Sequence, residues 1–250
     1  MLEQVIAQIG PLEQRAMADA QKQWNALAKP LGSLGRLESM VVQLAGITGR
    51  ADYRPDRRCV VVMCADNGVV CEGVTQTGQE VTALVTGNLA KGLAAVNLLA
   101  RRAGADVLPV DVGVAQAVDT PGVLDRKVAL GTANMAKGPA MSRQQARQSL
   151  AVGIDLARTL KEAGYQLLVT GEMGIGNTTT SSALAAFWLG LSPEAVTGRG
   201  AGLSSAGLAR KRQAVSYTHL DVYKRQSLVS GFGRAWRMRR MRPIIYRPSS

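Results

Sequence analysis

A chain of 250 residues with 46% hydrophobic residues can build one large domain or two small ones. Aromatic residues make up only 4%, and no run of about 18 apolar residues occurs, so a membrane span is not expected. The net charge of +12 suggests nucleic acid, but residues 215–250 carry eight of the 30 basic side chains and one acid. Residues 1–214 are therefore only mildly basic, which suits a small anionic substrate and does not require a polynucleotide.

Neither a targeting segment nor a metal motif is predicted. The first residues, MLEQVIAQIGPLEQRA, carry acids and lack the basic start and apolar core of a signal peptide. Cys59, Cys64 and Cys71 do not have zinc-site spacing, and the single histidine, His219, is remote from them in the sequence. We expect free thiols in a reducing cytoplasm and no metal.

Two helical segments are predicted at the N-terminus. Apolar side chains recur at intervals of three and four over residues 1–28, which Gly10 and Pro11 divide into two pieces. A further helix is expected over about residues 37–48, with Ser33 as a candidate cap.

The loop between these helices, residues 29–36, contains two glycines that permit a tight backbone. Its basic side chains, Lys29 and Arg36, are candidates for phosphate contacts. A solvated surface is the more usual explanation of a single basic residue, and both interpretations remain open.

A buried strand is predicted next. Residues 59–65, CVVVMCA, form a continuous apolar run, as expected for a strand covered on both faces. Ligands collect at the carboxyl ends of such strands, which makes Asp66 and Asn67 candidate site residues. Asn-Gly is also an ordinary turn sequence, and this alternative remains open.

A parallel crossover unit follows. The pattern predicts one helix over residues 81–103, stopped by Gly104, and then a strand over residues 105–114 that contains Asp111 near its end. Strand, helix and strand in this order indicate parallel pairing. A short strand is expected at residues 128–130.

The later elements alternate in the same way. Ser142 is expected to cap a helix that runs to about residue 163, and a central strand should include residues 167–169. Another short strand is expected to begin at Val196, followed by a short basic helix over residues 208–213.

A glycine turn follows the central strand. Residues 171–176 include three glycines, and Asn177 with three threonines leads into a helix of small residues at 181–189. A strand, a glycine turn and a helix leave free N–H groups at the positive end of a helix dipole, which favours anions. Glu172, placed within this turn, should face a neutral or cationic part of the ligand. A need for positive φ angles is a simpler explanation of the glycines. The spacing GxxGxG also matches neither the P-loop nor the dinucleotide-binding pattern.

A second glycine turn at residues 198–203 strengthens the phosphate interpretation. It is expected to follow a strand next to the central one, and Lys211 lies on the helix after it. Backbone donors from both turns and the Lys211 ammonium could then surround one phosphate.

Five motifs occur in the order found in one family. They are KPLGSLGRLE at 29–38, CADNGV at 64–69, GTANMAKGPAMS at 131–142, GEMGIGNTT at 171–179 and GRGAGL at 198–203. Over about residues 1–214 the chain resembles the nicotinate-nucleotide:dimethylbenzimidazole phosphoribosyltransferase family, CobT.

The resemblance implies an α/β fold with a doubly wound, mostly parallel sheet and flanking helices. Residues 1–50 would form a small N-terminal helical accessory domain, and residues 51–214 a Rossmann-like nucleotide-binding domain. The implied enzyme moves the phosphoribosyl group of nicotinate mononucleotide to 5,6-dimethylbenzimidazole, giving α-ribazole 5′-phosphate and nicotinate, as in cobalamin lower-ligand synthesis. It needs no cofactor.

The resemblance also implies roles for individual residues. Glu172 would assist proton handling or orientation, whereas Asn67 stands where the family often has the histidine of ADHGV. The implied phosphate-binding residues are Gly174, Gly176, Asn177, Thr178, Gly200, Gly202 and Lys211. The implied base pocket contains Thr77, Asp66 and Met173.

From Val215 the sequence departs from the family. The later strands, a glycine-rich loop and the distal glutamate regarded as general base are not found, and VSYTHLDVYKRQ resembles a translated sequencing adapter. We expect residues 215–250 to be an aberrant basic tail, disordered or ill-fitting. The chain would then expose an apolar sheet edge and be weakly active or inactive.

The expected partners follow from these interpretations. They are nicotinate mononucleotide and dimethylbenzimidazole, with a homodimer implied by the family, a cytoplasmic location, and no nucleic acid or membrane. Two alternatives remain: a nucleotide-binding protein without turnover, and a nucleic-acid binder that uses the arginine-rich tail.

Overall fold

The computed structural model describes residues 2–226 of this chain, with side chains described as far as residue 216. The predicted tail at 215–250, and the nucleic-acid binding assigned to it, therefore lie mostly outside the described residues. Within them the final helix, α9 (Ser205–Gln226), continues through residue 215 without a break, and Val215 is fully buried. The start of the predicted tail is thus helical and, at Val215, packed.

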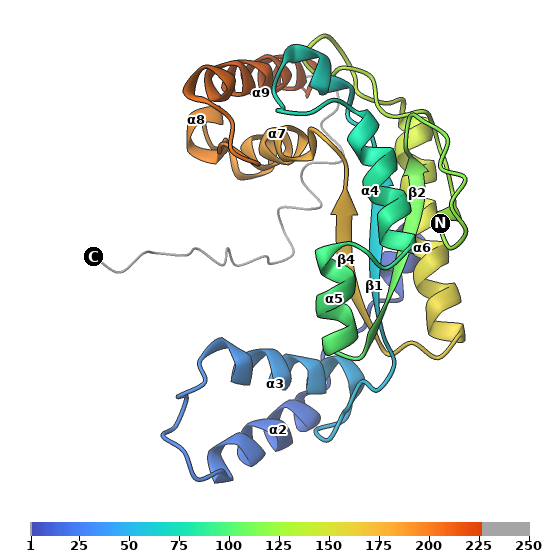
Figure 1. Ribbon diagram of the computed structural model, residues 1–250. Helices are drawn as coiled ribbons and strands as arrows, with labels where there is room; N and C mark the ends of the chain where they lie inside the picture. Colours follow the sequence, from blue (N-terminus) through green and yellow to red (C-terminus); the bar gives the residue numbers. More distant parts are fainter. Residues whose placement is uncertain (1, 227–250) are drawn as a thin grey trace.

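A parallel sheet forms the centre of the fold (Figure 1). Its strand order is β3-β2-β1-β4, and every pairing is parallel. The strands are β1 (Arg58–Ala65), β2 (Ala105–Gly113), β3 (Leu124–Asp125) and β4 (Leu167–Met173). The α/β fold with a parallel sheet is confirmed.

The strand register brings three chain segments together at one edge of the sheet. Cys64 at the end of β1 is paired with Asp111 of β2 and with Met173 of β4. Because parallel strands all end at the same edge, the segments after β1, β2 and β4 emerge side by side there. This edge is where the candidate residues gather.

Helices cover both faces of the sheet (Figure 1). Alternate residues of β1 face opposite sides: Val60 and Val62 pack with Leu89 and Ala100 of α4 (Glu80–Ala90) and α5 (Ala95–Arg102). Cys59 and Val61 pack instead with Leu156 and Leu160 of α6 (Arg143–Glu162). The continuous apolar run of β1 reflects this burial on both faces. The capping of α6 by Ser142, which accepts a hydrogen bond from the Gln145 N–H, is confirmed.

Two N-terminal helices, α2 (Gln14–Ala26) and α3 (Arg36–Thr48), pack on each other, apart from the sheet (Figure 1). The first helix, α1 (Leu2–Ala7), lies instead beside α6, where Val5 and Ile154 line one surface pocket. The break at Gly10 and Pro11 is confirmed. Ala16 and Ala20 of α2 meet Ala45 of α3 in a small separate cluster. The cap predicted at Ser33 is wrong: Gly35, with φ of 55°, precedes α3 and no side chain caps it.

The single helix predicted over residues 81–103 is also wrong. It is divided into α4 and α5, because the chain turns at Gly92 with a left-handed φ of 77°. The strand predicted at 128–130 is absent, and the short strand β3 lies earlier, beside β2, with Leu124 paired to Val110. Apolar residues continue with helical spacing on both sides of Gly92, which concealed the turn there.

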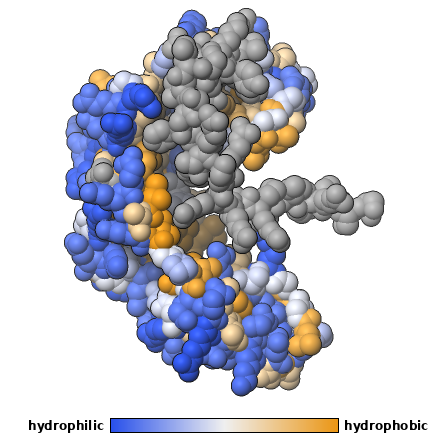
Figure 2. Space-filling view, turned by 180° about the vertical axis from the view of Figure 1, so that it is seen from behind, coloured by the Kyte–Doolittle hydropathy of each residue, from blue (hydrophilic) through white to orange (hydrophobic). Residues whose placement is uncertain are grey.

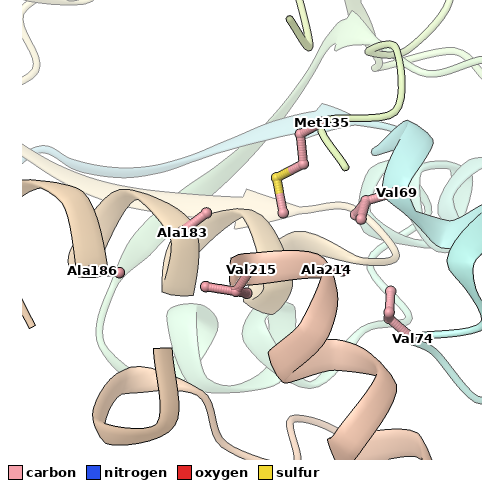
Figure 3. Packing of buried hydrophobic residues seen from close by; sticks show 7 residues of the cluster. All are labelled: Val69, Val74, Met135, Ala183, Ala186, Ala214 and Val215. Carbon is pink, nitrogen blue, oxygen red and sulfur yellow. The ribbon is translucent and has the colours of Figure 1, made fainter. Parts of the chain in front are cut away.

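A helical layer follows β4 at the carboxyl edge of the sheet. It comprises α7 (Asn177–Leu189), α8 (Pro193–Val196), α9 and the short helix η1 (Gly68–Glu72). The predicted strand at Val196 is wrong, since Val196 ends α8, whose N-terminus Ser192 caps. The core of this layer is shown in Figure 3 and contains Val69, Val74, Met135, Ala183, Ala186, Ala214 and Val215.

Apolar surface remains exposed along the inner side of the molecule. The outline is C-shaped, and hydrophobic residues gather on its inner side (Figure 2). Within the described chain β4 pairs only with β1, and Val169 on it is 45% exposed. The expected apolar sheet edge is therefore present.

One segment, Glu80–Arg102, is long and apolar enough by composition to cross a membrane. In the structure it is divided into α4 and α5, which contact the sheet. Length and composition carry little weight here, because core helices of soluble proteins meet the same criteria. Cys59 and Cys64 are buried and Cys71 is exposed; all three are free thiols, as predicted.

Candidate functional site

The turn between β4 and α7 forms the first wall of the candidate site. Glu172 belongs to β4 and not to the turn, which is a correction; the turn itself is Gly174 to Gly176. Gly176, with φ of 89°, stands directly before α7, and a Cβ there would lie 2.9 Å from Val70 Cγ2. Only glycine combines this backbone with this close approach.

Two backbone donors at the start of α7 are free. The Asn177 N–H donates to the Gly174 carbonyl (3.0 Å), and the Thr179 N–H donates to the Gly176 carbonyl (2.9 Å). Within the described residues, the Gly176 and Thr178 N–H groups make no hydrogen bond. These N–H groups, together with the positive end of the helix dipole, can bind an anion.

Lys211 of α9 lies against this helix start. Its side chain is only 1% exposed, and its Nζ donates to the Thr178 hydroxyl over 2.6 Å. No carboxylate of the described residues lies within 4.0 Å of the Nζ. Burial lowers the pKa of Lys211 from its ordinary value, because the ammonium loses water and gains no counter-charge.

The second glycine turn contacts the first, although it does not follow a strand as predicted. Gly200 has φ of 58°, and a Cβ there would lie 2.8 Å from Thr178 Oγ1 and 3.2 Å from Lys211 Nζ. The α7 start, Gly200 and Lys211 therefore converge on one place. Gly202, with φ of 98°, stands two residues further along the same turn.

The loop after η1 closes on the second glycine turn. Gln76 Nε2 donates to the Gly202 carbonyl over 2.6 Å, and the neighbouring Thr77 is exposed. Gln76 is a site neighbour that sequence reasoning missed, because a single glutamine in a polar loop carries no signal of its tertiary contact. Thr77, expected in the base pocket, thus lies one residue from this junction.

Glu172 and Asn177 form a polar pair at the other side of the turn. Asn177 Nδ2 donates to Glu172 Oε2, so this side chain and its own backbone N–H are both engaged within the protein. Residue Glu172 is exposed at the free edge of β4, but its carboxyl group is partly desolvated. This desolvation raises the pKa of the carboxyl, and the Asn177 hydrogen bond opposes that shift. Asn177 is therefore placed to orient Glu172, and its backbone N–H is not free for phosphate.

The remaining predicted residues lie deeper. Asp66 is 1% exposed, and its Oδ2 accepts a hydrogen bond from the Ala115 N–H (2.8 Å), so it has no surface to offer a base. Met173 is partly buried and packs against the cluster that includes Cys64. Asp111 is likewise engaged, in an ion pair of 2.7 Å with Lys127. Neither aspartate is placed to contact a ligand.

Comparison with known proteins finds one matching family model and close relatives in sequence. A family model described as phosphoribosyltransferase matches residues 9–228, past residue 214, where the sequence resemblance was expected to end. The nicotinate-nucleotide–dimethylbenzimidazole phosphoribosyltransferase of Acetivibrio thermocellus is 45% identical over 237 residues, covering 93% of this chain and 68% of the relative. That of Ruminiclostridium cellulolyticum is 49% identical over 222 residues, covering 89% and 63%.

Solved structures agree with this result. The crystal structure of CobT from Thermus thermophilus superposes with a TM-score of 0.78 at 46% identity, covering 83% of this chain and 62% of that protein. The chain thus spans about 60–68% of the length of the relatives it matches.

Proposed function

The chain belongs to the phosphoribosyltransferase family, and from that premise we propose that it binds nicotinate mononucleotide and transfers its phosphoribosyl group to 5,6-dimethylbenzimidazole. The products would be α-ribazole 5′-phosphate and nicotinate. The names of the relatives and the geometry of the α7 start support this proposal. A homodimer and a cytoplasmic location are further proposals that rest on the family resemblance alone.

One observation carries the proposal: Lys211 is buried, and no counter-charge among the described residues accompanies it. Removing an ammonium from water is costly unless an opposite charge or hydrogen bonds compensate. Here the Nζ donates to the Thr178 hydroxyl, beside two free backbone donors and Gly200. A phosphate monoester bound at this place would supply the missing negative charge and accept from all three donors.

The reaction sets further demands on the site. A benzimidazole nitrogen attacks the anomeric carbon, and the bond from that carbon to the pyridinium nitrogen breaks with its electron pair leaving on nicotinate. The other nitrogen of the attacking ring gives up its proton to water. Anchoring the phosphate holds the ribose between the two rings. This positioning of the reactants is most of what such a transfer needs from the protein. Glu172, held by Asn177, would face the cationic pyridinium, and Thr77 and Met173 would border the base.

The proposal is tested with the full chain and two measurements. Isothermal titration with nicotinate mononucleotide measures binding, and chromatography of a mixture with dimethylbenzimidazole measures α-ribazole 5′-phosphate. Heat with weak product formation is the expected result, in line with the weak activity expected from the sequence. Heat without product would reduce the function to nucleotide binding. The absence of both heat and product would contradict the proposal.

A further inference from the structure

Asn67, directly after β1, makes hydrogen bonds on both sides of its side-chain amide. Its Nδ2 donates to the carbonyl of Ile175 (3.2 Å), and its Oδ1 accepts from the Thr180 hydroxyl (2.8 Å). The side chain is 9% exposed, so water does not replace these partners easily. Asn67 thus connects the end of β1 to the turn after β4 and to the first turn of α7.

The two partners of Asn67 lie on either side of the free donors along the chain. Ile175 precedes Gly176, and Thr180 follows Thr178, so the amide contacts a backbone carbonyl before both N–H groups and a side-chain hydroxyl after them. The Ile175 N–H is fixed as well, because it donates to the buried Thr82 hydroxyl of α4 (3.0 Å). Both the N–H and the C=O of Ile175 are therefore hydrogen-bonded within the protein. The free donors are the Gly176 and Thr178 N–H groups that follow it.

The glycines of the turn allow Asn67 to fit beneath it. A Cβ on Gly174 would lie 2.1 Å from the Ala65 carbonyl oxygen and 2.9 Å from Asn67 Nδ2, and a Cβ on Gly176 would lie 2.9 Å from Val70 Cγ2 and 3.3 Å from Asn67 Cβ. These distances are too short for a real side chain without movement of its neighbour. The glycine pattern of this turn thus serves the contact with Asn67 as well as the backbone angle of Gly176.

We infer that Asn67 is a positioning residue for the phosphate: its amide fixes the 174–180 segment so that the Gly176 and Thr178 N–H groups converge with Lys211. This inference rests on the proposed function. The amide must donate to a carbonyl and accept from a hydroxyl at once. Leucine, similar in size, can do neither.

The test compares variants of the full chain by titration with nicotinate mononucleotide. N67L removes both contacts, and the loss of oriented donors should weaken binding about tenfold. T180V removes only one contact and should weaken binding about threefold. The matched controls are N25L and T159V, on exposed positions of α2 and α6, and both should bind as the wild type does.

Backbone resonances separate positioning from simple stabilisation. In ¹⁵N spectra of ligand-free N67L, recorded well below its melting temperature, the Gly176 and Thr178 amide signals should be displaced from their wild-type positions. A purely structural role would lower the melting temperature but leave these signals and the affinity unchanged, and that result would overturn the inference. If N67L does not fold, T180V decides: wild-type affinity overturns the inference, and weaker binding supports it.

The contacts of Asn67 can also be tested without ligand. Slow hydrogen exchange of its side-chain amide in the wild type is expected, and rapid exchange would show that the contacts do not form. A wild-type chain with slow exchange but no nucleotide binding would refute the proposed function, and with it the positioning role, while leaving the contacts themselves intact.

Discussion

Two lysines, one partly buried and one fully buried, have opposite surroundings in this molecule. Lys29, in the loop before α3, forms an ion pair of 2.8 Å with Glu38 and lies 5.6 Å from the centre of the Trp24 ring. Lys211 is buried more completely, and its Nζ donates to the Thr178 hydroxyl, with no carboxylate of the described residues nearby. The first lysine has its counter-charge within the described fold, whereas the second does not.

This difference distinguishes a structural lysine from a ligand-binding one. Lys29 and Lys211 were both candidates for phosphate contacts from sequence. The Lys29 ammonium lowers the pKa of the Glu38 carboxyl, so the pair stays charged and compensated. Lys211 has a lowered pKa, because burial alone acts on it. A missing counter-charge beside free N–H donors therefore marks the site more clearly than basic residues in a motif do.

The largest expected effect is that of K211M. Removing the ammonium should weaken nicotinate mononucleotide binding about a hundredfold, since a charge-assisted hydrogen bond to phosphate is lost. Without ligand the variant should be at least as stable as the wild type, because a desolvated charge has been removed. Titration and thermal unfolding measure the two effects. K161M, at an exposed position of α6, is the control and should bind normally; undiminished binding by K211M would remove the basis of the comparison.

The second prediction concerns Gly200. Alanine there must adopt a left-handed φ of 58°, and its Cβ would press on Thr178 Oγ1 and Lys211 Nζ. We expect binding to weaken about tenfold by titration. G190A is a close control, because Gly190 has φ of 65° and no atom within 4 Å of an added Cβ. Equal affinity losses in G200A and G190A would show that backbone strain, not the contact, is responsible.

The third prediction concerns Lys29, the lysine that has its counter-charge within the fold. K29M leaves the Glu38 carboxylate buried without its ion pair, so the melting temperature should fall. The affinity for nicotinate mononucleotide should stay unchanged, because Lys29 belongs to the α2–α3 unit. K22M, at an exposed position of α2, should change neither quantity. Weaker nucleotide binding by K29M would mean that the helical unit takes part in the site.

The smallest expected effect is a pH dependence due to Glu172. Burial raises the pKa of its carboxyl, so protonation begins at a higher pH than for an ordinary glutamate. As pH falls through this range, Glu172 loses its charge and attraction to the pyridinium weakens. The ratio of the affinities for nicotinate mononucleotide and ribose 5-phosphate, which share the phosphate, should therefore decrease. In E172Q the ratio should be flat with pH, and a flat ratio in the wild type would contradict the role of Glu172.

Sequence predicted the parts of the fold that depend on local pattern. The apolar run of β1, the Ser142 cap of α6 and the break at Gly10 and Pro11 are all local signals, and all were confirmed. The convergence of the two glycine turns with Lys211 was predicted as well. That prediction rested on the chemistry of phosphate binding by N–H groups and an ammonium, and on the order of the five motifs.

The missed features depend on contacts that a local pattern does not contain. The division at Gly92 escaped notice because apolar residues continue with helical spacing on both sides of it. Glu172 was placed in a turn since glycines flank it, yet pairing with Met63 keeps it in β4. Asn67 was a candidate from sequence, but its contacts were missed, as Gln76 was, because each joins residues more than 100 positions apart that only the folded chain brings together.

The most direct measurement is the position of the phosphate in a crystal of the full chain with nicotinate mononucleotide. We predict that its oxygens accept hydrogen bonds from the Gly176 and Thr178 N–H groups and from Lys211 Nζ, with the pyridinium ring towards Glu172. A phosphate bound elsewhere, with Lys211 still in contact with Thr178 alone, would contradict the account.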